Sequence, residues 1–230
     1  MCGRLFQTSP PKRLAELFGT VNPLSNAPPR YNAAPTDLLL TVRFNPKTGE
    51  RALDPLRWGL VPHWAHDAKI GASLTNARAE TIAQKPAFCD AYARRRCLVP
   101  VDGFYEWHRP ATGAKQPYAF AHPANESGER PVLALAGLWE SWRDPDGAIL
   151  RSVTLVTTAA NGVMAPIHHR MPVILAPEDW AAWLGETAGD VTALMRPCDD
   201  RHLDHWPVAP AVGNVRNQGA ELPLPLASPR

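Results

Sequence analysis

The fold of this 230-residue chain is decided by residues 97–108, which read CLVPVDGFYEWH. Two runs of β-branched, aromatic and other apolar side chains are separated here by a glycine-containing turn, a pattern typical of neighbouring strands. Three runs of the same kind follow, most of them bounded by glycine or proline, at Tyr118–His122, Val132–Trp142 and Ile149–Thr158. The second half of the chain therefore predicts a β core.

Towards the N-terminus, the sequence predicts one short helix and two more strands. Ser9-Pro10-Pro11 favours a helix start, and Gly19 favours its end. Residues 26–35 are rich in proline and predict a loop. Leu38–Arg43 and Arg51–Leu60 have strand composition and are separated by a turn sequence at residues 45–49.

The remaining segments are short or irregular. Ala79–Arg96 has helical composition broken by Pro86, and Pro177-Glu178-Asp179 is typical of a helix start. The segment Trp206–Leu226 is rich in proline and predicts extended chain. Strands dominate and βαβ alternation is absent, so we expect an α+β fold: one domain over residues 1–230, with an antiparallel, barrel-like β core flanked by short helices. From about residue 220 we expect an extended or disordered tail.

Composition excludes several classes of protein. The chain has 45% hydrophobic residues and eight tryptophans, which excludes a disordered or collagen-like chain. Its net charge of +2 means that any nucleic acid must bind a local basic patch. Four widely spaced cysteines do not form a disulfide framework, and no apolar run predicts a signal peptide or a membrane span. We expect a reduced, cytoplasmic protein, associated with the nucleoid if bacterial, that does not contact membranes.

The N-terminal Met1-Cys2-Gly3 is the most informative motif. Removal of Met1 would leave Cys2 with a free α-amine beside its thiol, and an α-amine with a pKa of about 7.7–8.0 is partly nucleophilic at neutral pH. Such an aminothiol condenses with an aldehyde to an imine, which the thiol closes to a thiazolidine. Alternatively, the thiolate could be the N-terminal nucleophile of an amide hydrolase, or Cys2 could be an incidental second residue.

Three polar segments could serve this nucleophile. Asn76 lies two residues before Arg78, and Glu106 lies between aromatic residues, where desolvation would raise the pKa of its carboxyl towards acid–base catalysis. His168 and His169 precede Arg170 in a loop. Read separately, Glu106 could be an exposed strand residue and His168 a core histidine.

The chain resembles the SRAP family, named for SOS-response-associated peptidase. Nine segments match in family order and span nearly the whole chain: MCGR at 1–4, RYNAAPT at 30–36, RWGLVPHW at 57–64, NARAET at 76–81, RCLVP at 96–100, DGFYEW at 102–107, KQPY at 115–118, IHHRMP at 167–172 and VGNV at 212–215. The resemblance implies a mixed barrel-like domain whose groove binds single-stranded DNA and whose Cys2 forms a thiazolidine with an abasic site.

The resemblance also implies roles for particular residues. Cys2 would be the nucleophile, Asn76 would orient its amine or the sugar, Glu106 would move protons, and His168 would act on the sugar oxygen and in crosslink reversal. The positions that match DNA contacts are Arg4, Pro35, Arg78, Trp107, Thr157 and Arg170. No metal or other cofactor is expected, and the protein would act as a monomer.

One position departs from the family pattern. Members often carry an acid after the motif histidine, whereas His169 follows His168 here. Which imidazole faces the site, and how firmly Arg170 is oriented, are therefore open.

Two other functions compete with abasic-site chemistry. A glutamine amidotransferase can also begin with Met-Cys-Gly, although no glutamine-binding motif is evident downstream. A module that holds single-stranded DNA without chemistry is the other alternative. A zinc site built from Cys198, His202 and His205, with His63 and His66, is disfavoured because no CxxC motif accompanies it.

Overall fold

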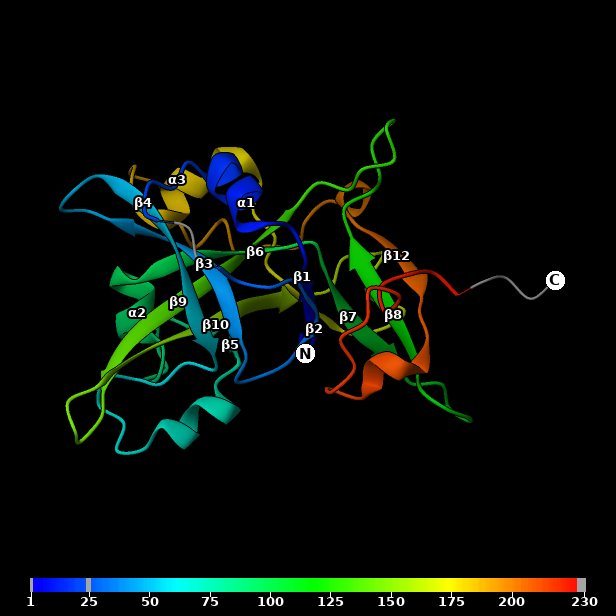
Figure 1. The fold of residues 1–230 in the computed structure, drawn as a ribbon, viewed down its shortest axis with the longest axis horizontal. Coiled ribbons are helices and arrows are strands. Elements are labelled where there is room, and N and C mark those ends of the chain that lie inside the picture. The colour runs from blue at the N-terminus through cyan, green and yellow to red at the C-terminus, as the bar shows by residue number, and fades with distance from the viewer. Residues whose placement is uncertain (1, 24–25, 227–230) are drawn as a thin grey trace.

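The computed structural model describes residues 2–23 and 26–226, and two β-sheets lie side by side in it (Figure 1). In the larger sheet, five strands pair in the order β10-β4-β3-β6-β9, and the pairing of β9 with β10 closes them into a ring. Two short strands, β5 and β11, extend this sheet from β10. The strands are β3 (Leu38–Asn45), β4 (Glu50–Trp58), β5 (Asn76–Arg78), β6 (Arg96–Val101), β9 (Leu133–Arg143), β10 (Ile149–Ala159) and β11 (Arg170–Pro172).

The second sheet has the strand order β12-β8-β7-β1-β2 and occupies the right half of Figure 1. All of its pairings are antiparallel. Its strands are β1 (Leu5–Gln7), β2 (Arg30–Ala33), β7 (Gly103–His108), β8 (Gln116–Ala121) and β12 (Asp204–Pro207). Because β6 belongs to the ring and β7 to this sheet, residues 96–108 join the two sheets.

Short helices cover the ring. Helix α1 ends where Gly19 adopts the left-handed conformation, with φ of 64°, and Phe18 of α1 stacks on Trp180 of α3 at 4.4 Å between ring centroids. The helices are α1 (Pro11–Phe18), α2 (Cys89–Arg94) and α3 (Trp180–Leu184), and the 3-10 turns are η1 (Ala68–Ser73), η2 (Pro177–Asp179), η3 (Asp200–His202) and η4 (Pro210–Gly213).

Successive residues of the ring strands face two different cores. Leu98 packs in a cluster with the side chains of α1 and α3, whereas Cys97 and Val99 pack in a second cluster that also holds Cys2 and Leu5. Side chains alternate between the two faces of a strand, and here both faces are buried. This explains why the strands read as continuous apolar runs, and it places Cys2 in a core that both sheets share.

The observed architecture confirms the predicted α+β fold with a barrel-like β core and short helices. Some local predictions were wrong. Residues 26–35 are not a loop throughout, because Arg30–Ala33 forms β2. Ala79–Arg96 is helical only over α2, because residues 79–88 form turns up to and around Pro86, whose ring cannot continue a helix. The core is also not purely antiparallel, since β10 pairs in parallel with both β4 and β5.

The C-terminal segment was expected to be extended or disordered from about residue 220, but it packs on the second sheet as far as Leu226. Leu222 is buried, Trp206 Nε1 donates to the Pro223 carbonyl at 2.7 Å, and Leu226 N donates to the Pro207 carbonyl at 2.9 Å. Residues 227–230 of the expected tail lie outside the described residues.

Candidate active site

The pairing of β1 with β7 brings the N-terminus to Glu106. Phe6 pairs with Gly103 and Leu5 with Phe104, and Tyr105 N donates to the Arg4 carbonyl at 2.9 Å. Continued towards the N-terminus, this register places residues 2 and 3 beside Glu106. Gly103 permits the close approach, because a Cβ there would lie 2.2 Å from the Phe6 ring.

Cys2 is 1% exposed, and its thiol lies in an apolar environment. Burial raises the pKa of the thiol far above its ordinary value, and the negative charge of Glu106 raises it further. A hydrogen bond from the main-chain N–H of Arg4 acts in the opposite direction. The thiol is therefore protonated at neutral pH, and Glu106 is close enough to affect its ionisation.

Asn76 reaches the same point from β5. Its Nδ2 donates to the Cys2 carbonyl at 2.8 Å and to Thr75 Oγ1 at 3.2 Å. Its Oδ1 is buried and has no hydrogen-bond partner within residues 2–23 and 26–226. A buried amide oxygen without a partner is unusual in a native structure and marks a place where a ligand or reacting group can donate a hydrogen bond.

His168 and His169 stack on each other, with ring centroids 4.5 Å apart. His168 is half-buried, and its Nδ1 lies 3.0 Å from both the main-chain N and the main-chain O of Arg170. His169 is exposed, and the neighbouring His168 lowers the pKa of its imidazole. The Arg170 main chain thus orients the His168 ring through Nδ1.

A cleft of about 710 Å³ opens between these segments. One wall is the end of β7 with the connection that follows it, and the other wall is the segment 165–169. Arg4 and Gly213 also border the cleft. Of the sequence-predicted site residues, the cleft is lined by Arg4, Glu106, Trp107 and His168.

Arg4 is tied into the wall of this cleft. Its guanidinium donates to Asn32 Oδ1 at 2.9 Å, to the Val212 carbonyl at 2.8 Å and to the Gly213 carbonyl at 3.2 Å. It also lies 5.9 Å from the centroid of the Trp107 ring, within cation–π range. Most of its donors are thus engaged within the protein, and it orients Trp107.

Arg170 and Thr157 do not line the cleft, and they bind each other. Thr157 is fully buried, and the Arg170 guanidinium is bound by both carboxylate oxygens of Glu80 and by the Thr157 carbonyl, at 2.7 Å. Arg170 in turn lowers the pKa of the Glu80 carboxyl. Because Thr157 also pairs with Arg78 across β10 and β5, this cluster connects the strand that carries Asn76 to the loop that carries His168.

Arg78 and Pro35 lie elsewhere around the site. Arg78 is exposed at the end of β5. Pro35 is half-buried in a turn in which the next residue, Thr36, has a φ of 81°. Neither residue lines the cleft in this structure.

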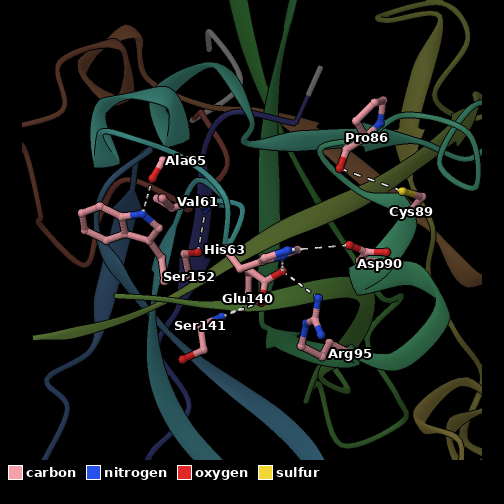
Figure 2. A network of polar contacts seen from close by, with 11 residues as sticks. Val61, His63, Ala65, Pro86, Cys89, Asp90, Arg95, Glu140, Ser141 and Ser152 are labelled. Carbon is pink, nitrogen blue, oxygen red and sulfur yellow. Dashed lines mark hydrogen bonds and ion pairs between the residues drawn. The ribbon is translucent and has the colours of Figure 1, made fainter. Parts of the chain in front are cut away.

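His63, one of the residues considered as a zinc ligand, has other partners. In Figure 2, His63 lies between Asp90 and Glu140, with Nδ1 3.4 Å from Glu140 Oε2, and Arg95 donates to the same oxygen at 2.7 Å. This network anchors the connection between β4 and β5 to the ring. Among the described residues, no group of three or more His, Cys, Asp and Glu side chains could hold a metal ion.

Several residues at the site were missed from sequence. Glu80 binds Arg170, and Asn32 binds Arg4. The cleft is also lined by His108, Arg109 and Lys115. The sequence signal for this end of the cleft was a pair of cations, one at each end of the connection from β7 to β8, which contains proline and glycine.

Within the described part of the chain, no helix has the length and apolar character needed to cross a membrane.

Comparisons with known proteins identify the family of this chain. The family model described as SOS response associated peptidase (SRAP) matches residues 1–215. The abasic site processing protein YoqW of Bacillus subtilis is 37% identical over 227 residues, covering 96% of this chain and 98% of YoqW. The abasic site processing protein HMCES of Mus musculus is 33% identical over 231 residues, covering 86% of this chain and 65% of that protein.

Two solved structures have the same fold. A protein from Bacteroides thetaiotaomicron superposes with a TM-score of 0.80 at 23% identity, covering 91% of this chain and 93% of its own. A phage-related protein from Bordetella bronchiseptica superposes with a TM-score of 0.68 at 30% identity, covering 90% of this chain and 94% of its own.

Proposed function

This chain belongs to the SRAP family, and on that premise we propose that it processes abasic sites in single-stranded DNA by forming a covalent crosslink through Cys2. Hydrolysis of the Met1–Cys2 bond exposes the α-amine first. Met1 lies outside the described residues, so this step is proposed from the chemistry of the N-terminus. The names of the similar proteins YoqW and HMCES support the substrate.

The proposed crosslink needs no oxidant and no cofactor. The α-amine of Cys2 attacks the aldehyde of the ring-opened sugar, and loss of one water leaves an imine. The Cys2 thiol then adds across the C=N bond: a carbon–sulfur bond forms, and the thiol proton ends on nitrogen. The product is a five-membered thiazolidine, and the reverse steps release the DNA.

The surroundings of Cys2 suit this sequence of proton transfers. A neutral thiol does not compete with the amine for the aldehyde, and Glu106 can accept the thiol proton when the imine is in place. The buried Oδ1 of Asn76 can accept a hydrogen bond from the α-amine and thus direct its lone pair. His168, which lines the cleft, can protonate the sugar oxygen as the ring opens.

The cleft suits an anionic, base-less strand. Its lining holds Arg4, Arg109 and Lys115, and the Trp107 ring offers a stacking surface for a neighbouring base. An abasic site presents no base edge, so affinity must come from phosphates and stacking, with little sequence preference and strong salt dependence.

The observation that carries the proposal is the convergence of Cys2, Asn76 and Glu106 beside a cationic cleft. The test is a denaturing gel of Met1-free protein incubated with single-stranded DNA that contains one abasic site. A shifted band that survives SDS supports crosslinking, and its absence refutes it. Ammonia release from glutamine would instead support an amidotransferase, and retention of DNA without an adduct would support a binding module.

A further inference from the structure

The connection between β7 and β8 carries two cations at its base. β7 ends at His108 and β8 begins at Gln116, and these two residues pair across the hairpin. Arg109 and Lys115 are the next residue on each side, so they lie next to each other where the connection begins and ends. In Figure 1 this connection projects at the lower right, below β7 and β8.

Both side chains are exposed, and both line the cleft. Within residues 2–23 and 26–226, neither makes an ion pair or a side-chain hydrogen bond. Among the lining residues that the structure describes, the one carboxylate is Glu106, which is 5% exposed and therefore buried away from this end. Like charges at adjacent cross-strand positions repel each other, so this pair is suited to an anion that binds between them.

Of the three arginines expected at phosphates, Arg78 does not line the cleft, and the other two are less available. Arg4 is engaged by Asn32 and two main-chain carbonyls, and Arg170 is 8% exposed and bound by Glu80. A phosphate would have to displace these partners. Arg109 and Lys115 have no partners among the described residues that a phosphate would have to displace. They are therefore the favoured phosphate contacts on this side of the cleft.

The direction of β7 determines where Arg109 and Lys115 lie relative to Glu106. β7 runs outward from Glu106 past Trp107 to the hairpin, and three residues at about 3.3 Å each place Arg109 about 10 Å from Glu106. We propose that Arg109 and Lys115 form a phosphate-binding clamp for the single strand on one side of the abasic site, beyond the nucleotide that stacks on Trp107. This rests on the proposed function, because it assumes that DNA occupies the cleft.

The test measures non-covalent binding of a single strand that contains a stable abasic analogue without an aldehyde, as a function of salt. The double variant Arg109→Gln/Lys115→Gln is compared with Lys12→Gln/Lys47→Gln, which removes two exposed cations from α1 and from the β3–β4 turn. Each lost phosphate contact lowers the slope of log K against log salt by about 0.7 for a single strand. We expect the hairpin variant to lose about 1.4 in slope and the control variant to bind like wild type.

A second arm uses strands shortened from either end. Removing nucleotides on one side of the analogue should abolish the difference between wild type and the hairpin variant, and removing them on the other side should preserve it. An unchanged slope in the hairpin variant, an equal loss in the control, or insensitivity to both truncations would overturn the clamp. A lost slope in protein that forms no adduct with true abasic DNA supports the clamp while refuting the proposed chemistry. A normal adduct together with an unchanged slope in the hairpin variant supports the proposed chemistry and refutes the clamp.

Discussion

The side-chain amide of Asn76 donates a hydrogen bond to the main-chain carbonyl of Cys2 at 2.8 Å, across 74 residues of sequence. β5 holds Asn76 by its parallel pairing with β10, and β1 holds the N-terminal segment by its pairing with β7. The larger sheet thus supplies the amide, and the second sheet supplies the cysteine. The hydrogen bond between Asn76 and Cys2 therefore links the two sheets.

This hydrogen bond predicts the effect of removing the Asn76 amide. Asn76→Asp keeps the shape but cannot donate to the Cys2 carbonyl, and Asn76→Ala loses both the donor and the buried Oδ1. Misplacement of the reacting amine costs about a hundredfold. We therefore expect both variants to form the adduct about 10 to 100 times more slowly at saturating DNA, measured by quenched time courses on denaturing gels. Wild-type rates in both variants would remove Asn76 from the mechanism.

Glu106→Gln should separate chemistry from binding. Loss of the carboxylate removes the group that accepts the thiol proton, and general acid–base catalysis is worth about a hundredfold or more. The affinity for DNA that contains the aldehyde-free analogue should change little, because Glu106 is buried. Loss of the negative charge should also lower the pKa of the Cys2 thiol, which thiol alkylation across a pH series would detect. An unaltered adduct rate would contradict the role given to Glu106.

The two histidines differ in their environment, and this predicts different phenotypes. His168 is half-buried with Nδ1 oriented by the Arg170 main chain, whereas His169 is exposed. His168→Ala should slow reversal of the crosslink more strongly than His169→Ala. The measurement is release of DNA from the purified adduct in the presence of excess competing aminothiol. A larger effect at His169 would show that the other imidazole faces the sugar.

The ion pair between Glu80 and Arg170 predicts a pH-dependent stability. Because Arg170 lowers the pKa of Glu80 in the folded state, the pair stabilises the fold above the unfolded pKa of about 4.3, and this contribution is lost as pH falls through the folded value. The Glu80 side chain is 52% exposed, so solvent limits the contribution to about 1 kcal/mol, or about 2–4 °C in Tm.

Thermal melts of wild type and Glu80→Gln check this. The variant should melt lower than wild type at pH 7, and the two should converge near pH 3. Glu126→Gln, which changes an exposed carboxylate without an ion pair among the described residues, is the matched control. A difference that persists unchanged at pH 3 would show that the Glu80 charge is not what stabilises this cluster.

The strands and the short helices were predictable from sequence because their cause is local. Runs such as Cys97–Val101 are apolar on both faces, and Gly19 ends α1 by its backbone conformation alone. The short strands β1, β2, β5, β11 and β12 were not predicted. Three or four residues carry too little pattern, and these strands depend on pairing with their neighbours.

The motifs predicted some of the neighbours of Cys2 but not the orientations of the arginines. Cys2, Asn76 and Glu106 come together as the motifs imply. The inward orientation of Arg170 depends on Glu80, 90 residues earlier, and that of Arg4 on Asn32 and the carbonyls of residues 212 and 213. Such long-range partners leave no periodic signal in a single sequence.

In the proposed crosslink, the amine and the thiol of Cys2 both bond to one carbon of an abasic site. Intact mass spectrometry of Met1-free protein incubated with abasic single-stranded DNA tests it most directly, with Cys2→Ser as the comparison. We predict a species of protein plus DNA less one water that survives denaturation without a reductant, and a Cys2→Ser adduct that appears only after borohydride reduction. An irreversible adduct of equal yield in Cys2→Ser, or no adduct in the wild type, would contradict the account.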